Sequence, residues 1–373
     1  MRIAQIAPLI ESVPPKLYGG TERVVSHLTE ALVNQGHEVT LFASGDSVTA
    51  AELVPCSERA LRLDSTIRDP LPHYMVMLDR VRRRAADFDI LHFHIDYLHF
   101  PLFRDIADRT LTTQHGRLDL PDLPVAYRAF SEFSLVSISD HQRRPCPDWR
   151  WLRTVHHGLP AHLYPFSPLA RSGYLAFLGR ICPEKRPDHA IEIARRTGVP
   201  LKIAAKVDRV DQTYFDEVIR PLLRDPLIEY VGEIGEEDKA AFLGAASALL
   251  FPIDWPEPFG LVMIEAMACG TPVIAYRRGS VPEVIDEGWT GFIVDDLEGA
   301  VAAVAKLERL DHGTIRARFE QRFTAERMAN DYVAAYSSLM TIPELSPMTL
   351  VRDYAFGTAA SRDGSGIGAA NAA

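Results

Sequence analysis

The chain has 373 residues, a formal net charge of −10 and 47% hydrophobic residues, values typical of a soluble protein with more than one core. The acidic balance argues against nucleic acid as a partner, and no run of about eighteen apolar residues is present to span a membrane. Four scattered cysteines without metal-type spacing predict a reducing, cytoplasmic location and no structural zinc: Cys56, Cys146, Cys182 and Cys269.

The first half of the chain opens with a predicted β-α-β unit. A strand at Arg2–Pro8 leads through a loop rich in Pro and Gly to a helix that Thr21 is expected to cap, and a strand follows at Glu38–Ala43. Gly19 and Gly20 lie at the strand-to-helix turn, where parallel sheets bind ligands, but the G-x-G-x-x-G pattern of dinucleotide sites is absent. A tight turn and a ligand loop are both consistent with these two glycines.

An arginine-rich helix is predicted at Tyr74–Ala86. It carries Arg80, Arg82, Arg83 and Arg84. The main interpretation of this run is a solvated helix face, and weak peripheral contact with anionic lipid or with a phosphorylated acceptor is the minority interpretation.

Histidines gather near three further predicted strands, at Asp89–His94, Thr110–His115 and Ser134–Ser139. The spacing of His92, His94, His99 and His115 matches no metal-binding pattern, so no metal site is predicted. His115 closes a strand and opens a loop, where α/β domains place reactive side chains. A purely structural role for His115 is the alternative.

A strand at Leu152–Gly158 and a proline-rich linker at Leu159–Ser172 separate two similar halves. The alternation then restarts, with strands at Tyr174–Leu178, Leu201–Ala205, Ile228–Val231, Ala248–Pro252, Pro272–Tyr276 and Gly291–Val294. Helices are expected at Pro187–Thr197, Gln212–Leu223, from Glu236, and at Gly299–Leu310 and Ala325–Leu339. The pattern predicts an α/β fold with two doubly wound parallel-sheet domains facing a cleft, at residues 1–165 and 166–324, then a helix at 325–340 and a disordered tail at 341–373.

The stretch Phe251–Gly270 carries the first motif with clear chemistry. A strand ends here in a proline-broken loop, and a helix begins near Phe259 and Gly260, where free backbone N–H groups suit anions. Glu257 lies just before this helix and Glu265 about two turns along it. An N-cap acid with a surface glutamate is the simple alternative. However, Glu265 lies among apolar residues, and a buried acid needs a partner such as a ligand hydroxyl.

The second motif is the loop Gly179–Lys185, which directly follows a strand. Gly179 lets the backbone approach a ligand closely, while Arg180 and Lys185 place two cations in one loop. Opposite the helix terminus near Glu257, these cations form a cradle for a diphosphate. A surface loop paired with Glu184 is the alternative for this segment alone.

Four motifs in this order strongly resemble the retaining glycosyltransferases of family 4, also called glycosyltransferase group 1: G-R-x-x-P-E-K, E-P-F-G-L-x-x-x-E, G-S-V-P-E and T-G-F. The resemblance covers about residues 1–340. It implies a GT-B fold of two Rossmann-like domains, in which the first binds the acceptor, the second binds the nucleotide sugar, and the final helix crosses back to the first domain. It also implies transfer without a metal or cofactor, because cations and helix ends neutralise the leaving diphosphate.

The resemblance also implies roles for individual residues. Arg180 and Lys185 would bind the diphosphate and stabilise its charge, Glu257 would hold donor-sugar hydroxyls, and His115 would lie beside the donor sugar. Glu265 would accept hydrogen bonds from the ribose. The remaining donor-binding residues would be Gly19, Gly20, Gly179, Glu233, Ile234, Phe259, Gly260 and Leu261. The chain departs from the family at Ala205–Asp208, where members often have a glycine-rich turn.

The expected activity is therefore a cytoplasmic, metal-independent, retaining transfer of a hexose from a nucleoside-diphosphate sugar. A donor like UDP-glucose is favoured over GDP-mannose, and the acceptor, a saccharide, a lipid-linked molecule or a small molecule, is open. Two alternatives remain. A GT-B sugar-nucleotide epimerase would act without an acceptor, and a catalytically silent nucleotide-sugar-binding protein would not need all of Arg180, Lys185, Glu257 and Glu265.

Overall fold

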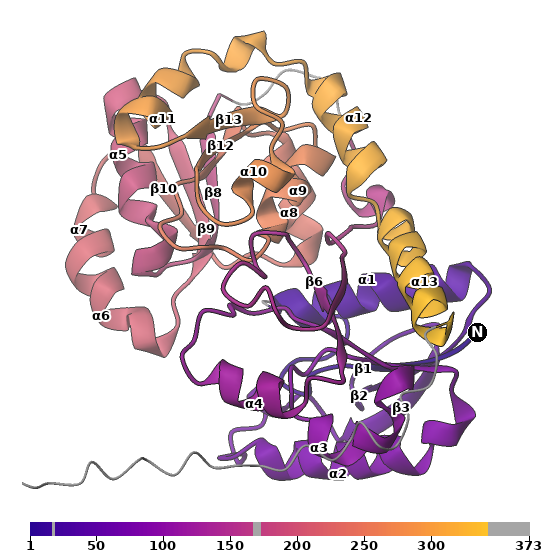
Figure 1. The fold of residues 1–373 in the computed structure, drawn as a ribbon. Coiled ribbons are helices and arrows are strands. Elements are labelled where there is room, and N and C mark those ends of the chain that lie inside the picture. The colour runs from indigo at the N-terminus through magenta and orange to yellow at the C-terminus, as the bar shows by residue number, and fades with distance from the viewer. Residues whose placement is uncertain (17–18, 167–172, 342–373) are drawn as a thin grey trace, which may run out of the picture.

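The computed structural model describes residues 1–16, 19–166 and 173–341, which form two domains, each built on a parallel sheet (Figure 1). The strand order is β3-β2-β1-β4-β5-β6-β7 in the first sheet and β10-β9-β8-β11-β12-β13 in the second. In both sheets the order reverses beside the earliest strand, and such switch points open ligand-binding crevices at the carboxyl ends of the strands. The predicted α/β fold of two doubly wound, Rossmann-like domains is confirmed.

The first domain alternates short buried strands with helices. Its strands are β1 (Arg2–Ile6), β2 (Glu38–Ser44), β3 (Glu52–Ser57), β4 (Ile90–Phe93), β5 (Thr110–Thr113), β6 (Ser134–Ser137) and β7 (Trp151–Thr154). Its helices are α1 (Gly20–Asn34), α2 (Leu71–Arg83), α3 (Phe100–Phe103) and α4 (Leu123–Ala129).

The second domain repeats this alternation. Its strands are β8 (Leu175–Arg180), β9 (Leu201–Lys206), β10 (Ile228–Gly232), β11 (Ala248–Phe251), β12 (Val273–Tyr276) and β13 (Gly291–Val294). Its helices are α5 (Pro187–Thr197), α6 (Gln212–Tyr214), α7 (Arg220–Leu222), α8 (Glu236–Gly244), α9 (Leu261–Ala268), α10 (Val281–Val284), α11 (Leu297–Val304) and α12 (His312–Arg322).

Some elements differ from the sequence prediction. Edge strand β3 and helix α12 were not predicted, and the sequence of β3 shows why: ELVPCS contains a proline and no clear apolar alternation, as edge strands often do. The capping role expected for Thr21 is wrong, because helix α1 begins at Gly20 and the residue before it, Gly19, makes no side-chain cap. The last strand of the first half, β7, ends at Thr154 rather than at Gly158.

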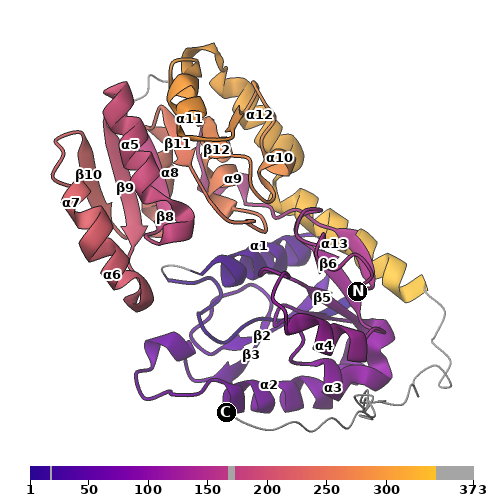
Figure 2. The same cartoon turned by 60° about the vertical axis from the view of Figure 1, so that its left-hand side comes forward.

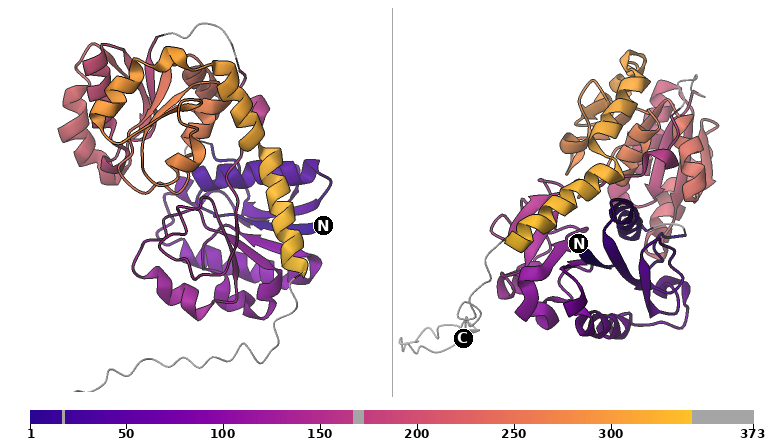
Figure 3. Two further views of the ribbon diagram at one scale, coloured as in Figure 1. Left: turned by 45° about the horizontal axis from the view of Figure 1, so that its top comes forward. Right: turned by 90° about the vertical axis from the view of Figure 1, so that its right-hand side faces the viewer.

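The final helix, α13 (Ala325–Thr341), leaves the second domain and packs on the first (Figures 1 and 3). Its residues Met328, Tyr332 and Tyr336 are fully buried in one core cluster with Ile3 of β1 and Leu28 of α1. The crossing of this helix back to the first domain is thereby confirmed. The exact domain limits at residues 165 and 324 stay predictions, and the predicted tail lies, from residue 342 onward, outside the described residues.

The two places where the chain passes between the domains lie side by side. Leu159, in the first connection, donates its N–H to the carbonyl of Phe323 (2.9 Å) and accepts from the N–H of Ala325 (2.9 Å) in the second. A second contact joins the domains nearby, where the Glu283 carboxylate accepts the backbone N–H groups of Asp140 and His141, each at 2.7 Å. Helix α1 lies along the top of the first domain and faces the second (Figure 2).

The arginines at the end of helix α2 have partners within the first domain, one on the same helix and the others on neighbouring elements. Arg82 pairs with Asp105 (2.6 Å), Arg83 with Asp79 (2.9 Å) and Arg84 with Glu52 (2.9 Å), while Arg80 donates to the carbonyl of Pro55. These contacts agree with a solvated helix face, and lipid contact stays a prediction. Within the described ranges, no helix combines the length and the apolar character needed to cross a bilayer.

Candidate functional site

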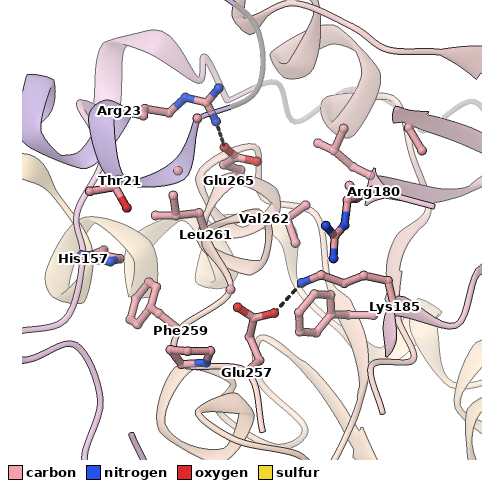
Figure 4. Close-up of a pocket in the computed structure, with 18 of the residues that line it drawn as sticks. Thr21, Arg23, His157, Arg180, Lys185, Glu257, Phe259, Leu261, Val262 and Glu265 are labelled. Carbon is pink, nitrogen blue, oxygen red and sulfur yellow. Dashed lines mark hydrogen bonds and ion pairs between the residues drawn. The ribbon is translucent and has the colours of Figure 1, made fainter. Parts of the chain in front are cut away.

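A cavity of about 460 Å³ lies between the two domains (Figure 4). It is lined from one side by the start of helix α1 and the loops after β5 and β7, and from the other by the ends of β8, β9 and β11 and the start of helix α9. The structure brings every residue of the predicted site into this lining: Gly19, Gly20, His115, Gly179, Arg180, Lys185, Glu233, Ile234, Glu257, Phe259, Gly260, Leu261 and Glu265. Their individual roles stay predictions.

The wall of the cavity carries more cations than carboxylates although the protein is acidic. Among the described residues that line it, five cations face three carboxylates. The cations are Arg23, Arg180, Lys185, Lys206 and Lys239, and the carboxylates are Glu233, Glu257 and Glu265. A concave wall with this balance attracts an anion.

Arg180 and Lys185 occupy the ends of the loop that follows strand β8. Arg180 lies 3.4 Å from Asp208 and 3.6 Å from Asp211, and Lys185 forms an ion pair with Glu257 (Figure 4). A guanidinium has five donors and an ammonium three, so each cation keeps donors for a phosphate while it holds its carboxylate. The segment that departs from the family pattern, Ala205–Asp208, supplies Lys206 to the cavity and Asp208 to Arg180.

The loop that carries Glu257 is held by its neighbours. Gly260 has a φ of 79°, in the left-handed region that favours glycine, and directly precedes helix α9. From the next motif along the chain, Ser280 donates its N–H to the Glu257 carbonyl (3.0 Å) and its hydroxyl to the Phe259 carbonyl (2.7 Å). Gly279 lies so close that a Cβ there would be 2.2 Å from the Glu257 carbonyl oxygen. The G-S-V-P-E motif therefore braces the E-P-F-G loop.

Glu265 has cationic partners that the sequence did not predict. Its Oε1 atom accepts from Lys239 Nζ (2.9 Å) and from Arg23 Nη1 (3.3 Å), and its side chain is 3% exposed. Arg23 comes from helix α1 of the first domain and also pairs with Glu236 of helix α8 (2.9 Å). The ion pair between Arg23 and Glu265 joins the domains across the cavity, opposite Lys185 and Glu257 (Figure 4).

His115 stands at the end of a buried hydrogen-bonded chain that begins on helix α13. Tyr336 bridges Gln5 Nε2 (3.1 Å) and His92 Nδ1 (2.8 Å) through its hydroxyl. Gln5 Oε1 lies 2.8 Å from His94 Nε2, and His94 Nδ1 lies 2.9 Å from His115 Nε2. The cavity is thus connected to the crossing helix through polar atoms.

This chain determines which nitrogen of His115 carries the proton. Burial lowers the pKa of His115 to about 3 and the pKa of His94 well below its usual value, so both rings are neutral at neutral pH. The Gln5 amide oxygen can only accept, so His94 Nε2 donates to it and His94 Nδ1 accepts from His115 Nε2. Among the described residues His115 Nδ1 has no hydrogen-bond partner, and it is left as an acceptor for a ligand hydroxyl.

Several lining residues were missed by the sequence analysis, among them Thr21, Arg23, His157, Lys206, Lys239 and Trp255. A signal existed for one of them. His157-Gly158 follows strand β7 as His115-Gly116 follows β5, and the two imidazole rings stack with centroids 5.4 Å apart. No local pattern marks Arg23, whose partner Glu265 lies 242 residues away in the sequence.

Comparisons with known proteins agree with this architecture. The sequence profile described as Glycosyltransferase Family 4 matches residues 18–183, and the profile described as Glycosyl transferases group 1 matches residues 168–324. Together they account for both domains and for the cavity between them. The chain belongs to glycosyltransferase family 4.

Two relatives and one solved structure illustrate what this family 4 glycosyltransferase is similar to. Glycogen synthase of Mycobacterium tuberculosis is 26% identical over 86% of this chain and 89% of that enzyme. D-inositol 3-phosphate glycosyltransferase of Corynebacterium kroppenstedtii is 33% identical, but the match spans only 36% of this chain and 28% of that protein. Among solved structures, HepE of Anabaena in complex with UDP and glucose has a TM-score of 0.69 at 18% identity, covering 91% of this chain and all of that one, which supports the GT-B fold.

Proposed function

We propose that this family 4 glycosyltransferase moves a hexose from a nucleoside-diphosphate sugar to an acceptor with retention of anomeric configuration and without a metal ion. The five cations that line one cavity of an otherwise acidic chain carry this proposal, because they match a diphosphate. A donor like UDP-glucose is favoured over GDP-mannose, since HepE of Anabaena binds UDP and glucose. A cytoplasmic location is part of the same proposal.

In the proposed reaction the bond between the sugar C1 and the phosphate oxygen breaks, and a bond from an acceptor oxygen to C1 forms on the same face. The proton of the acceptor hydroxyl passes to the leaving phosphate. Arg180 and Lys185 stabilise the negative charge that grows on the diphosphate, as fixed cations in a partly dry site can. Glu257 and the neutral ring of His115 orient sugar hydroxyls by accepting hydrogen bonds from them, and Glu265 does the same for the ribose.

The experiment measures nucleotide release from UDP-, GDP- and ADP-sugars, with and without EDTA, for the wild-type protein and for Glu257→Ala. We expect slow release from one donor, unchanged by EDTA and lowered at least about tenfold in the variant. Loss of release with EDTA would contradict metal independence. Unchanged turnover in Glu257→Ala would contradict the assignment of the site.

The same assay separates the two alternative functions. Conversion of the nucleotide sugar into an isomer without acceptor would indicate an epimerase, so the sugar product is identified by chromatography. Nucleotide binding without release, in the presence of a broad set of acceptors, would indicate a silent binding protein. Absence of any nucleotide binding would count against the whole proposal.

Weak peripheral membrane contact through the helix α2 arginines, Arg80, Arg82, Arg83 and Arg84, is a separate proposal. Three of them form ion pairs with acidic residues of the same domain, which reduces the charge available to anionic lipid. Flotation with vesicles that contain or lack anionic lipid tests it. Equal flotation with both vesicle types would contradict membrane contact through these arginines.

A further inference from the structure

A second cavity, of about 430 Å³, lies in the first domain directly beside the cavity described above. The two cavities share Thr21, His115 and Gly116 in their walls. A molecule bound in the second cavity can therefore extend past His115 into the first cavity. Its size falls in the range of small-molecule sites.

The wall of the second cavity lacks the cations of the first. Among the described residues that line it, Asp96 is the one charged side chain, and no Lys or Arg is present. His94 and His115 also contribute to the wall, but burial lowers the pKa of both imidazoles, so they are neutral. The wall consequently offers no cation to a phosphate or carboxylate group.

Asp96 is available to a ligand. Within the described ranges, its carboxylate makes no hydrogen bond or ion pair. The residue keeps access to solvent, yet protein atoms crowd the carboxylate, and this desolvation raises the pKa of Asp96 to about 6. At neutral pH the group is still mainly ionised. Because the residue is exposed, water can hydrate its oxygens, and the hydroxyl of a bound ligand can take the place of that water as donor.

The rest of the wall suits hydroxyl groups and a sugar ring. Tyr74 accepts the N–H of Leu9 (3.1 Å) at its phenol oxygen and keeps its own proton to donate. Tyr97, beside Asp96, is 39% exposed and lines the same cavity, and an aromatic side chain is a surface on which the C–H face of a sugar can lie.

We propose that the second cavity binds the acceptor, and that this acceptor is an uncharged, hydroxyl-rich molecule, a sugar or polyol, rather than a phosphorylated or carboxylated one. Vicinal hydroxyls would donate to Asp96. An anionic group in the same position would meet the Asp96 charge with no cation to offset it. The inference rests on the proposed transferase function and specifies its acceptor.

The test compares acceptors in matched pairs that differ by one phosphate group: glucose with glucose 6-phosphate, myo-inositol with an inositol monophosphate, and maltose with maltose 1-phosphate. The readout is acceptor-stimulated nucleotide release above the slow release to water. Within the pair that the enzyme accepts as substrates, we expect kcat/KM to be at least about tenfold higher for the neutral compound than for the phosphorylated one. Preference for the phosphorylated member, or stimulation by none of the neutral compounds, would overturn the proposal.

Two variants and a control sharpen the result. Asp96→Asn keeps the shape and removes the charge, so the efficiency with the neutral acceptor should fall about tenfold while release to water stays within about twofold. Asp96→Lys should shift the preference toward the phosphorylated member of each pair. Glu58→Gln, at an exposed acid of the same domain, should change neither. In the wild-type protein, release to water combined with a preference for the phosphorylated acceptors would refute the acceptor proposal alone. Absence of release from every donor would refute the transferase function.

Discussion

Arg180 is the residue at which charge stabilisation can be tested most directly. Arg180→Gln keeps hydrogen-bonding groups but removes the positive charge, so the cost should fall on the step in which negative charge develops. We expect kcat to fall at least about tenfold, measured as product formation at saturating donor.

The matched control for this prediction is Arg196→Gln. Arg196 also belongs to the second domain, but it pairs with Glu298 on helix α11 and lines neither cavity. Its loss should leave kcat unchanged. Equal effects of the two variants would mean that Arg180 acts through the stability of the domain and not on the leaving group.

At the residue scale, the sequence predicted those site residues that lie close together along the chain. Arg180 and Lys185 lie five positions apart in one loop, and Glu257 and Glu265 share one motif, so their proximity follows from the chain itself. The cations that pair with Glu265 could not be predicted in this way. Arg23 meets Glu265 only because helix α1 faces helix α9 across the domain interface, an arrangement that no local pattern encodes.

At the scale of elements, the brace between the G-S-V-P-E and E-P-F-G motifs makes a clear prediction. A Cβ at Gly279 would lie 2.2 Å from the carbonyl oxygen and 2.5 Å from the nitrogen of Glu257, so Gly279→Ala must displace the loop that carries Glu257. We expect at least about tenfold lower activity and a loss of about 1–3 kcal/mol in the free energy of unfolding, measured by urea denaturation.

Gly288→Ala separates the steric clash from backbone strain. Gly288 also has a positive φ, 75°, but nothing lies within 4 Å of a Cβ built there. The control should lose some stability and keep its activity. If Gly279→Ala behaves in the same way, the brace does not position Glu257.

Helix α13 is linked to the cavity by the hydrogen-bonded chain that begins at the Tyr336 hydroxyl, and this chain gives a second prediction at the scale of elements. Tyr336→Phe removes the group that joins Gln5 and His92, so the amide of Gln5 loses the partner that orients it. We expect a several-fold lower kcat, a cost of about 1 kcal/mol in stability, and a changed tautomer of His115 visible in its imidazole nitrogen resonances.

Tyr174→Phe is the matched control, because it removes a hydroxyl that donates to the Phe242 carbonyl (2.6 Å) in the second domain, away from His115. A similar loss of stability without a change in kcat is the expected result. If the His115 nitrogen resonances are unaltered in Tyr336→Phe, the hydrogen-bonded chain from Tyr336 does not determine the tautomer of His115. Tyr336 could not be associated with the site from sequence, since 331 positions separate it from Gln5.

For the whole molecule, six histidines determine the response to acid, of which five are buried and His115 is half-buried. Burial lowers the pKa of all six: His27, His92, His94, His99, His115 and His157. Below a pH of about 6.5 these side chains take up protons in the unfolded chain while they stay neutral in the folded one, so stability falls as the pH falls. Each contributes up to about 1.4 kcal/mol per pH unit.

Four acids act in the opposite direction, because burial raises the pKa of Glu11, Glu22, Asp96 and Asp211. With this offset we expect the free energy of unfolding to fall by at least about 3 kcal/mol between pH 7.5 and 5.5, measured by urea denaturation. As a control, His162→Gln changes an exposed histidine and should leave the pH dependence of the free energy of unfolding unchanged. A constant free energy over the interval would contradict the burial of these imidazoles in neutral form.

The general architecture could be predicted from the alternation of strands and helices, because buried parallel strands appear as short apolar runs such as Ala248–Phe251. The crossing helix was expected only through the family resemblance, since its amphipathic sequence does not indicate which domain it covers. The strand β3 was missed because the edge of a sheet needs little apolar character.

The position of helix α13 also affects how the protein is made. The first domain is discontinuous in sequence, because Tyr332 and Tyr336 complete a core that begins with Ile3. On the ribosome the second domain can finish folding first, while the earlier-synthesised strands of the first domain wait for the last helix. A chimaera that takes its second domain from a relative therefore needs two junctions in the chain. The hydrogen bonds of Leu159 with Phe323 and Ala325 show that these two junctions lie next to each other in space.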